Sequence, residues 1–196
     1  RGRNVRNTQM KNDTTVKIAG GTERETALCD ALKSARSEQN VKAEFYNAVG
    51  IGEAQVKGDT FSGVLFVFRK EKKISAARLS SMLAQALYTV RKIRYEETER
   101  MLPERICGVC REEAFLAYTQ DFSAFCGKRA GNDYDWDRTP ASPCPVLTRD
   151  LLSSPQLCRV RVYSLGKAGE EKAFRAALAG ACGEQLSMFP KEKKPI

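Results

Sequence analysis

Val64-Leu65-Phe66-Val67-Phe68 is the stretch of this 196-residue chain that decides the fold. Five consecutive apolar residues predict a strand that is buried on both faces, which is typical of the centre of a sheet. After a charged turn, apolar residues recur at intervals of three and four and predict an amphipathic helix from residue 76 to at least residue 94. Ser75 is suited to cap the first turn of this helix. The apolar positions of the helix are Leu79, Met82, Leu83, Ala86, Leu87, Val90 and Ile93.

The remaining elements follow from the same patterns of hydrophobicity, caps and turn residues. The spacing Thr22-Glu23-Arg24-Glu25 is that of a capping box and predicts a helix over residues 23–38. Strands are expected over 41–49, 51–56 and 61–68, a hairpin over 105–110 and 114–119, a strand over 158–163 and a helix over 169–186. This order predicts an α/β fold with a mixed central sheet flanked by helices. It has an α-β-β-β-α-β core and a C-terminal strand–helix extension.

The chain is expected to divide into a core and several attached segments. Residues 1–17 are polar and basic and predict a flexible arm, and residues 18–127 predict the α/β core. Residues 128–147 are rich in Gly, Asp, Asn and Pro and predict a long irregular loop. Residues 148–187 form the strand–helix extension, and residues 188–196 a tail or a linker.

Histidine is absent from the sequence, which excludes several classes of enzyme. Ser-His-Asp and Cys-His catalysis and the His-Cys-Cys site of zinc deaminases are ruled out. The seven cysteines are odd in number and irregularly spaced, which favours a reduced cytoplasmic protein over a secreted disulfide framework. No apolar run approaches 18 residues, so no membrane partner is expected.

The net charge of +9 favours a polyanionic partner. Residues 57–105 hold 11 basic and 6 acidic residues and form the most basic block. DNA is the expected partner and RNA the alternative; a soluble basic protein with solvated charges is the simpler reading. The cations that flank the helix over 76–94 are the expected phosphate contacts: Arg69, Lys70, Lys72, Lys73, Arg78, Arg91, Lys92 and Arg94. The last three are also placed to complement the dipole of that helix.

Cysteine spacing raises the question of a zinc site. Cys107 and Cys110 form a Cys-x-x-Cys pair, and Cys126 and Cys144 are candidates for the third and fourth ligands. Cys126 and Cys144 are far apart in the sequence, whereas four-cysteine zinc sites normally use two close pairs. Cys107 and Cys110 also fall on an expected strand. Small apolar core cysteines are therefore the favoured interpretation, with Zn²⁺ as the alternative.

The only tryptophan lies in the expected irregular loop. Trp136 and Tyr134 stand among three aspartates in the segment 132–138. An exposed aromatic residue in such a loop can grip a base or a partner surface. The favoured interpretation is that Trp136 and Tyr134 attach the loop to the domain.

The expected α-β-β-β-α-β order resembles the core of the PD-(D/E)xK nucleases, which cleave DNA with Mg²⁺. The resemblance implies that Asp59, Glu71 and Lys73 are catalytic: two carboxylates would hold Mg²⁺, and the lysine would position or activate water. In that family the acid and the lysine lie within a strand, whereas Glu71 and Lys73 follow the apolar strand. A charged turn over residues 69–73 is the alternative.

Four segments, 79–92, 105–109, 135–140 and 160–163, are similar to the nuclease-like module that precedes the methyltransferase domain in bacterial restriction–modification or phage-defence enzymes. The similarity spans about residues 22–186. The chain has no Asn-Pro-Pro-Tyr motif and no Gly-rich S-adenosylmethionine loop, so it is not itself the methyltransferase. The resemblance implies a methyltransferase or another defence-system domain as a partner.

Together these features predict a DNA-binding domain of a bacterial DNA-modification or defence system, without catalysis or a cofactor of its own. A Mg²⁺-dependent nuclease is the first alternative. An assembly or scaffold subunit that binds acidic protein or RNA is the second.

Overall fold

The strand β3 (Val64–Phe68) is buried at all five positions, as the sequence predicts. The computed structural model describes residues 21–127 and 134–183. The predicted arm over 1–17 and the tail over 188–196 lie outside these residues. The sheet has five strands in the order β2-β3-β4-β5-β6. The other strands are β2 (Thr60–Phe61), β4 (Arg105–Val109), β5 (Glu113–Tyr118) and β6 (Arg161–Ser164).

The sheet is mixed, because one of its four strand pairs is parallel. β3 and β4 run parallel and are joined by the long helix α4 (Ala76–Glu96), whereas the other three pairs are antiparallel. A parallel pair needs a crossover connection, and α4 supplies it. The Ser75 side chain caps this helix by accepting a hydrogen bond from the Arg78 N–H at 3.1 Å, which confirms the predicted start.

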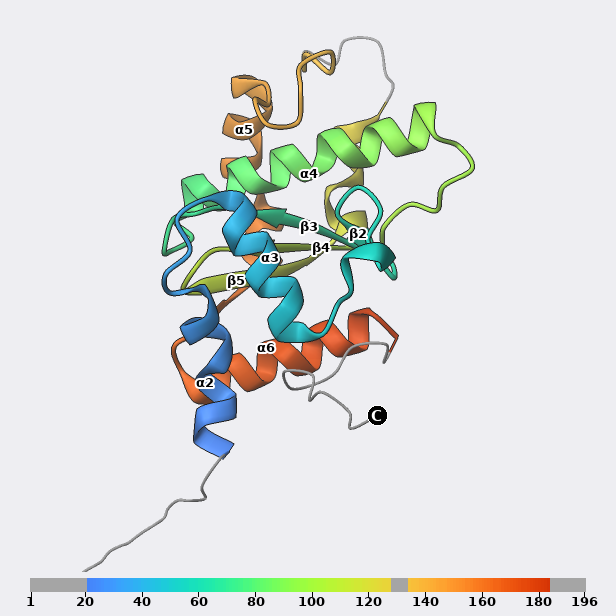
Figure 1. Ribbon diagram of the computed structural model, residues 1–196. Coiled ribbons are helices and arrows are strands. Elements are labelled where there is room, and N and C mark those ends of the chain that lie inside the picture. The colour runs from blue at the N-terminus through green and yellow to red at the C-terminus, as the bar shows by residue number, and fades with distance from the viewer. Residues whose placement is uncertain (1–20, 128–133, 184–196) are drawn as a thin grey trace, which may run out of the picture.

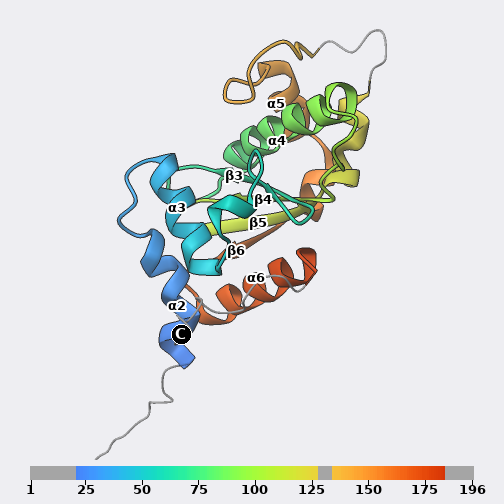
Figure 2. The ribbon, with the colours of Figure 1, turned by 45° about the vertical axis from the view of Figure 1, so that its right-hand side comes forward.

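Helices cover both faces of the sheet and give three layers (Figures 1 and 2). One face carries α4 and α5 (Pro145–Leu152). The other carries α2 (Gly21–Leu32), α3 (Glu38–Val49) and α6 (Ala168–Ala181). Short 3-10 helices lie at Glu53–Gln55 (η1), Thr119–Cys126 (η2) and Pro155–Arg159 (η3). Within the described ranges, no helix combines the length and the apolar character needed to cross a bilayer.

Two separate hydrophobic cores result, one on each face of the sheet. Val64, Phe66 and Phe68 pack toward α2, α3 and α6, while Leu65 and Val67 pack toward α4, α5 and η2. Burial of each such side chain contributes roughly 1.5–3 kcal/mol. The α/β class, the mixed sheet and the flanking helices are therefore confirmed.

The segment between the first helix and β3 differs from the expectation. Residues 41–49, predicted as a strand, are the helix α3, and residues 51–56 hold only η1. The helix predicted over 23–38 ends at Leu32. Ser37 starts the new helix by accepting a hydrogen bond from the Asn40 N–H, and Gly50 ends it with a left-handed φ of 81°. The observed elements over residues 21–109 therefore run α-α-β-β-α-β in place of α-β-β-β-α-β.

Of the C-terminal elements, the hairpin, the last strand and the last helix were predicted, whereas α5 and the 3-10 helices η2 and η3 were not. The predicted hairpin is formed by β4 and β5. The expected last strand and helix are β6 and α6, both shorter than predicted. α5 begins at Pro145, inside the segment expected to be irregular, and residues 128–133 of that segment lie outside the described residues.

A buried ion pair within α6 is hydrogen-bonded to the backbone of α2. The Glu171 carboxylate accepts a hydrogen bond from the Leu28 N–H at 2.7 Å, and Arg175 Nε lies 3.9 Å from the other carboxylate oxygen. The two side chains are 0% and 3% exposed. Burial lowers the pKa of Arg175, and the charge of Glu171 opposes this effect. The pair fixes α2, whose C-terminal end leads into the loop before α3.

The close contact of Gly108 with Phe115 provides a test of the sheet register. A Cβ atom at Gly108 would lie 2.0 Å from the Phe115 ring, because the two residues face each other across β4 and β5. We expect Gly108→Ala to lower the free energy of unfolding by about 1–3 kcal/mol in urea denaturation. The control is Gly180→Ala in α6, where a Cβ meets nothing within 4 Å. It should raise stability by about 0.5–1 kcal/mol. Equal stability of both variants would contradict the register.

Candidate functional site

The eight cations predicted to contact phosphates fall into two groups at opposite ends of α4. Residues 69–78 surround its first turn, and residues 91–94 lie in its last two turns. Arg78 and Arg91 are 13 positions apart, or about 20 Å along a helix. The half-buried side chains between them on α4, Ser81, Gln85 and Thr89, are uncharged. The eight residues therefore do not form one continuous basic surface.

Three cations of the first group are bound to neighbouring side chains. Arg69 donates to Gln85 Oε1 at 2.6 Å. Arg78 Nε lies 3.8 Å from the Glu71 carboxylate, and Lys73 Nζ lies 3.4 Å from that of Glu112. Lys70 and Lys72 are exposed and form no ion pair with the described residues. These two lysines are the cations of this turn that remain available to an anion.

Lys72 opens onto a cavity of about 500 Å³ where further cations gather. Lys33 and Arg36 come from the segment that follows α2, and Arg111 comes from the turn between β4 and β5. The cavity is lined by Cys29, Asp30, Lys33, Arg36, Lys72, Arg111 and Glu112. We call this set the basic cavity. Four cations against two carboxylates give its lining a net charge of +2.

Backbone pairing holds the walls of the basic cavity together. The Arg111 N–H donates to the Glu71 carbonyl at 3.0 Å, and the Glu112 N–H donates to the Lys72 carbonyl at 2.9 Å. These bonds link the turn between β4 and β5 to the turn between β3 and α4. Lys72 and Arg111 therefore stand on one rigid frame.

The Arg111 side chain bridges two walls of the cavity. Its Nε donates to the Lys70 carbonyl at 2.7 Å, and its Nη1 donates to the Lys33 carbonyl at 3.1 Å. A guanidinium carries five N–H groups, so three of those of Arg111 have no acceptor among the described residues. The guanidinium is thus already oriented, with donors left for a ligand.

Cys29 does not give the cavity a nucleophile. Burial raises the pKa of its thiol, and the negative charges of Glu112 and Asp30 raise it further. A thiol with a raised pKa stays protonated at neutral pH and reacts poorly. Cys29 therefore gives the basic cavity no activated nucleophile.

Sequence reasoning did not identify Lys33, Arg36 or Arg111 as site residues. A helix over 23–38 would have placed the first two on a regular helical surface, whereas the chain leaves the helix at Leu32. The expected hairpin over 105–110 and 114–119 leaves Arg111 in a polar turn. The only signal in the sequence is the concentration of cations around the end of the helix predicted over 23–38. A local signal of this kind does not show that the hairpin turn lies beside these cations.

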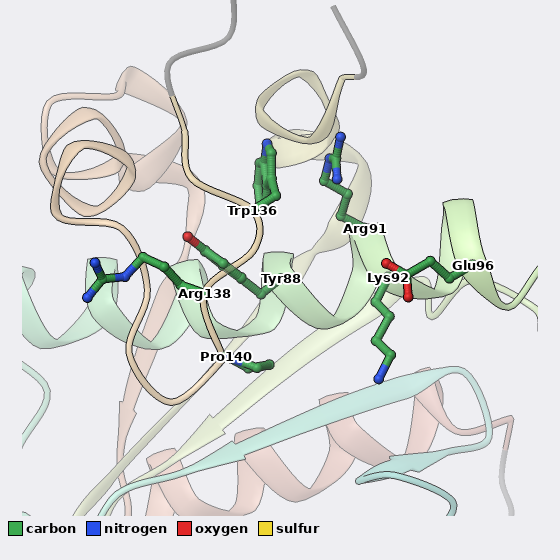
Figure 3. A pocket seen from close by; sticks show the side chains of 7 residues that line it. All are labelled: Tyr88, Arg91, Lys92, Glu96, Trp136, Arg138 and Pro140. Carbon is green, nitrogen blue, oxygen red and sulfur yellow. The ribbon is translucent and has the colours of Figure 1, made fainter.

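Arg91, a member of the second group of cations, lies beside Trp136 (Figure 3). The Trp136 ring packs on Tyr88 with centroids 4.8 Å apart, and the Arg91 guanidinium lies 4.9 Å from its centroid. The cavity between α4 and this loop has a volume of about 70 Å³. The charged ends of Arg91, Lys92 and Arg138 point in three different directions (Figure 3). These cations do not converge on one ligand.

Trp136 and Tyr134 attach their loop to the domain, which confirms the favoured interpretation. Tyr134 donates to the Asp150 carboxylate at 2.7 Å. The Tyr88 hydroxyl donates to the Asp135 carbonyl and accepts a hydrogen bond from the Cys144 N–H at 2.9 Å. Trp136 already contacts side chains of α4 and of its own loop and has a structural role here.

The three residues proposed as catalytic are held by different partners. Asp59 lies 2.9 Å from Lys42 Nζ and accepts a hydrogen bond from the Tyr46 hydroxyl. Glu71 pairs with Arg78 and Lys73 with Glu112. Over residues 21–127 and 134–183, no three Cys, Asp or Glu side chains are placed to share a metal ion. Two-carboxylate Mg²⁺ chemistry at Asp59 and Glu71 stays a prediction from the sequence, without a geometric feature to support it.

The four candidate zinc ligands are divided between the two cores. Cys107 lies in the core on the α3 face, whereas Cys110, Cys126 and Cys144 lie in the core on the α4 face. Burial raises the pKa values of Cys110 and Cys126 to about 12, which opposes the thiolate form that Zn²⁺ needs. All seven cysteines are unpaired. This placement favours core cysteines.

The Tyr88 hydroxyl provides a test of how the loop is attached. We expect Tyr88→Phe to lower the free energy of unfolding by about 1–3 kcal/mol, because the Cys144 N–H is left buried without its partner. Limited proteolysis should cut within residues 134–144 sooner than in the wild type. Tyr118→Phe is the control, since that side chain is 58% exposed. Equal cleavage rates would show that the hydroxyl does not hold the loop.

Comparison with known proteins does not assign a family to this arrangement. No family model, no curated protein and no solved structure matches the chain. Function is therefore argued from the basic cavity and its surroundings.

Proposed function

We propose that this chain binds DNA through its phosphates and serves as a non-catalytic binding domain. The observation that supports this most directly is the basic cavity, where Lys33, Arg36, Lys72 and Arg111 converge from three parts of the fold. Exposed Lys70 extends the same basic end of the molecule. Phosphate contacts by lysine and arginine supply most of the affinity in sequence-independent DNA binding.

The size of the molecule allows more than one contact with a duplex. The second group of cations lies about 20 Å from the first along α4, and 20 Å of duplex carries about 12 phosphate charges. Exposed Lys92 and Arg94 then meet a different part of the same DNA. The net charge of +9 supports association with any polyanion of this density.

The biological setting rests on the sequence resemblance. Similarity of segments 79–92, 105–109, 135–140 and 160–163 to a module next to methyltransferase domains supports a role in bacterial DNA modification or defence. In such a role the chain holds DNA for a partner domain that carries out the chemistry. A methyltransferase is the partner that this resemblance suggests.

DNA binding is tested by fluorescence anisotropy on a short duplex over a range of salt concentrations. We expect Lys72→Gln and Arg36→Gln each to weaken binding by about two- to fivefold at low salt, the effect of one exposed ion pair. Each should also reduce the slope of log K against log salt by about one. Arg149→Gln on α5 is the matched control, because it makes the same charge change away from the basic cavity.

The absence of DNA binding at low ionic strength would overturn the proposal. Equal losses in Lys72→Gln, Arg36→Gln and Arg149→Gln would show that net charge, and not the basic cavity, supports binding. Tighter binding to RNA of the same length would transfer the function to RNA.

The nuclease alternative has its own test. We expect supercoiled plasmid to remain intact with the protein and Mg²⁺ or Mn²⁺, because Asp59, Glu71 and Lys73 are each held by a different partner. Gel electrophoresis after prolonged incubation measures nicked and linear products. Metal-dependent cleavage that is lost in Asp59→Ala would establish the nuclease instead.

A further inference from the structure

We infer that the basic cavity binds a terminal phosphate monoester of a DNA strand in preference to a phosphodiester within the strand. This rests on the proposed DNA binding and adds to it the recognition of phosphorylated ends. The inference follows from the size of the cavity, its charge and the orientation of Arg111.

The size of the cavity distinguishes an end from the interior of a strand. The last turn of α2 with the segment after it, the β3–α4 turn and the β4–β5 turn line the cavity. Its volume of about 500 Å³ is that of a small-ligand site. A phosphodiester carries a nucleoside on each side, so it contacts the exposed cations at the mouth of the cavity while its two nucleosides stay outside. A terminal phosphate is attached on one side only and can enter with its own nucleotide.

The charge of the cavity matches a monoester. Its four cations and two carboxylates leave a net charge of +2, and one of the carboxylates, Glu112, also pairs with Lys73 outside the cavity lining. A phosphate monoester carries about −1.5 to −2 charges at pH 7, whereas a diester carries one. A dianion therefore gains more from this cavity than a backbone phosphate does.

Arg111 is oriented for such a ligand before it binds. Two hydrogen bonds to the Lys70 and Lys33 carbonyls fix the guanidinium, and three N–H groups remain without acceptors among the described residues. The planar fork of arginine suits the oxygens of phosphate, and a fixed fork loses little side-chain freedom on binding. Lys72, on the same backbone frame, supplies a second charge beside it.

The inference is tested with three DNA substrates of one sequence: a duplex with phosphate at its strand ends, the same duplex with hydroxyl ends, and a closed circle. We expect the phosphorylated duplex to bind about tenfold more tightly than the hydroxyl duplex, the effect of one charge-assisted hydrogen bond. The circle should bind like the hydroxyl duplex per unit length. Millimolar inorganic phosphate should abolish the preference without abolishing binding.

Variants test whether the preference for phosphorylated ends arises in the basic cavity. Lys72→Gln and Arg111→Gln should remove the preference for phosphorylated ends. Lys72→Gln leaves the two hydrogen bonds of Arg111 to carbonyls intact, so it serves if Arg111→Gln fails to fold. Lys92→Gln, at the other end of α4, is the matched control and should weaken binding to all three substrates equally.

The outcomes separate the two proposals. Equal affinity for phosphorylated and hydroxyl ends would overturn end recognition and leave DNA binding standing, whereas no binding to any substrate would overturn both. Calorimetry with a nucleoside monophosphate tests the other source of the same chemistry. Tight binding of the free nucleotide without a preference for phosphorylated ends would assign the cavity to a small molecule.

Discussion

The alternation of side chains along β3 is the constraint on which the rest of the structure depends. A strand that buries five apolar residues in succession must be covered on both faces, since both faces are apolar. α3 meets Phe66 and Phe68 on one face, with the Phe45 ring centroid 5.6 and 5.8 Å from theirs. α4 covers Leu65 and Val67 on the other. The same strand then ends at the charged turn that forms part of the basic cavity.

Patterns within one segment were sufficient to predict an element where its apolar residues fit only one type of secondary structure. The apolar residues of α4 recur with a helical period over five turns, and only a helix buries all of them. Residues 41–49 were ambiguous, because Val41, Ala43 and Phe45 alternate like a strand while Val41, Phe45 and Val49 also share one side of a helix. The cap at Ser37 and the left-handed Gly50 resolve this choice, and the strand prediction gave them no weight.

The candidate site was predictable only in part, for a related reason. The cations of residues 69–73 follow a buried strand, and their concentration was visible in the sequence. The contribution of Arg111 depends on the parallel pairing of β3 and β4, which places the β4–β5 turn beside residues 70–72. The contribution of Lys33 and Arg36 to the site depends on where α2 ends. Strand order and helix ends are set by long-range packing, which a pattern within one segment does not contain.

The buried pair of Glu171 and Arg175 in α6 affects the part of the basic cavity that lies at the end of α2. Removing one member of a fully buried ion pair leaves an uncompensated charge and costs about 3–5 kcal/mol. Glu171 is bonded to the backbone of α2 at Leu28, one turn before the segment that carries Lys33 and Arg36. Any partner that displaces α6 therefore also releases the α2 side of the cavity. The packing of α6 is thus linked mechanically to the α2 side of the basic cavity.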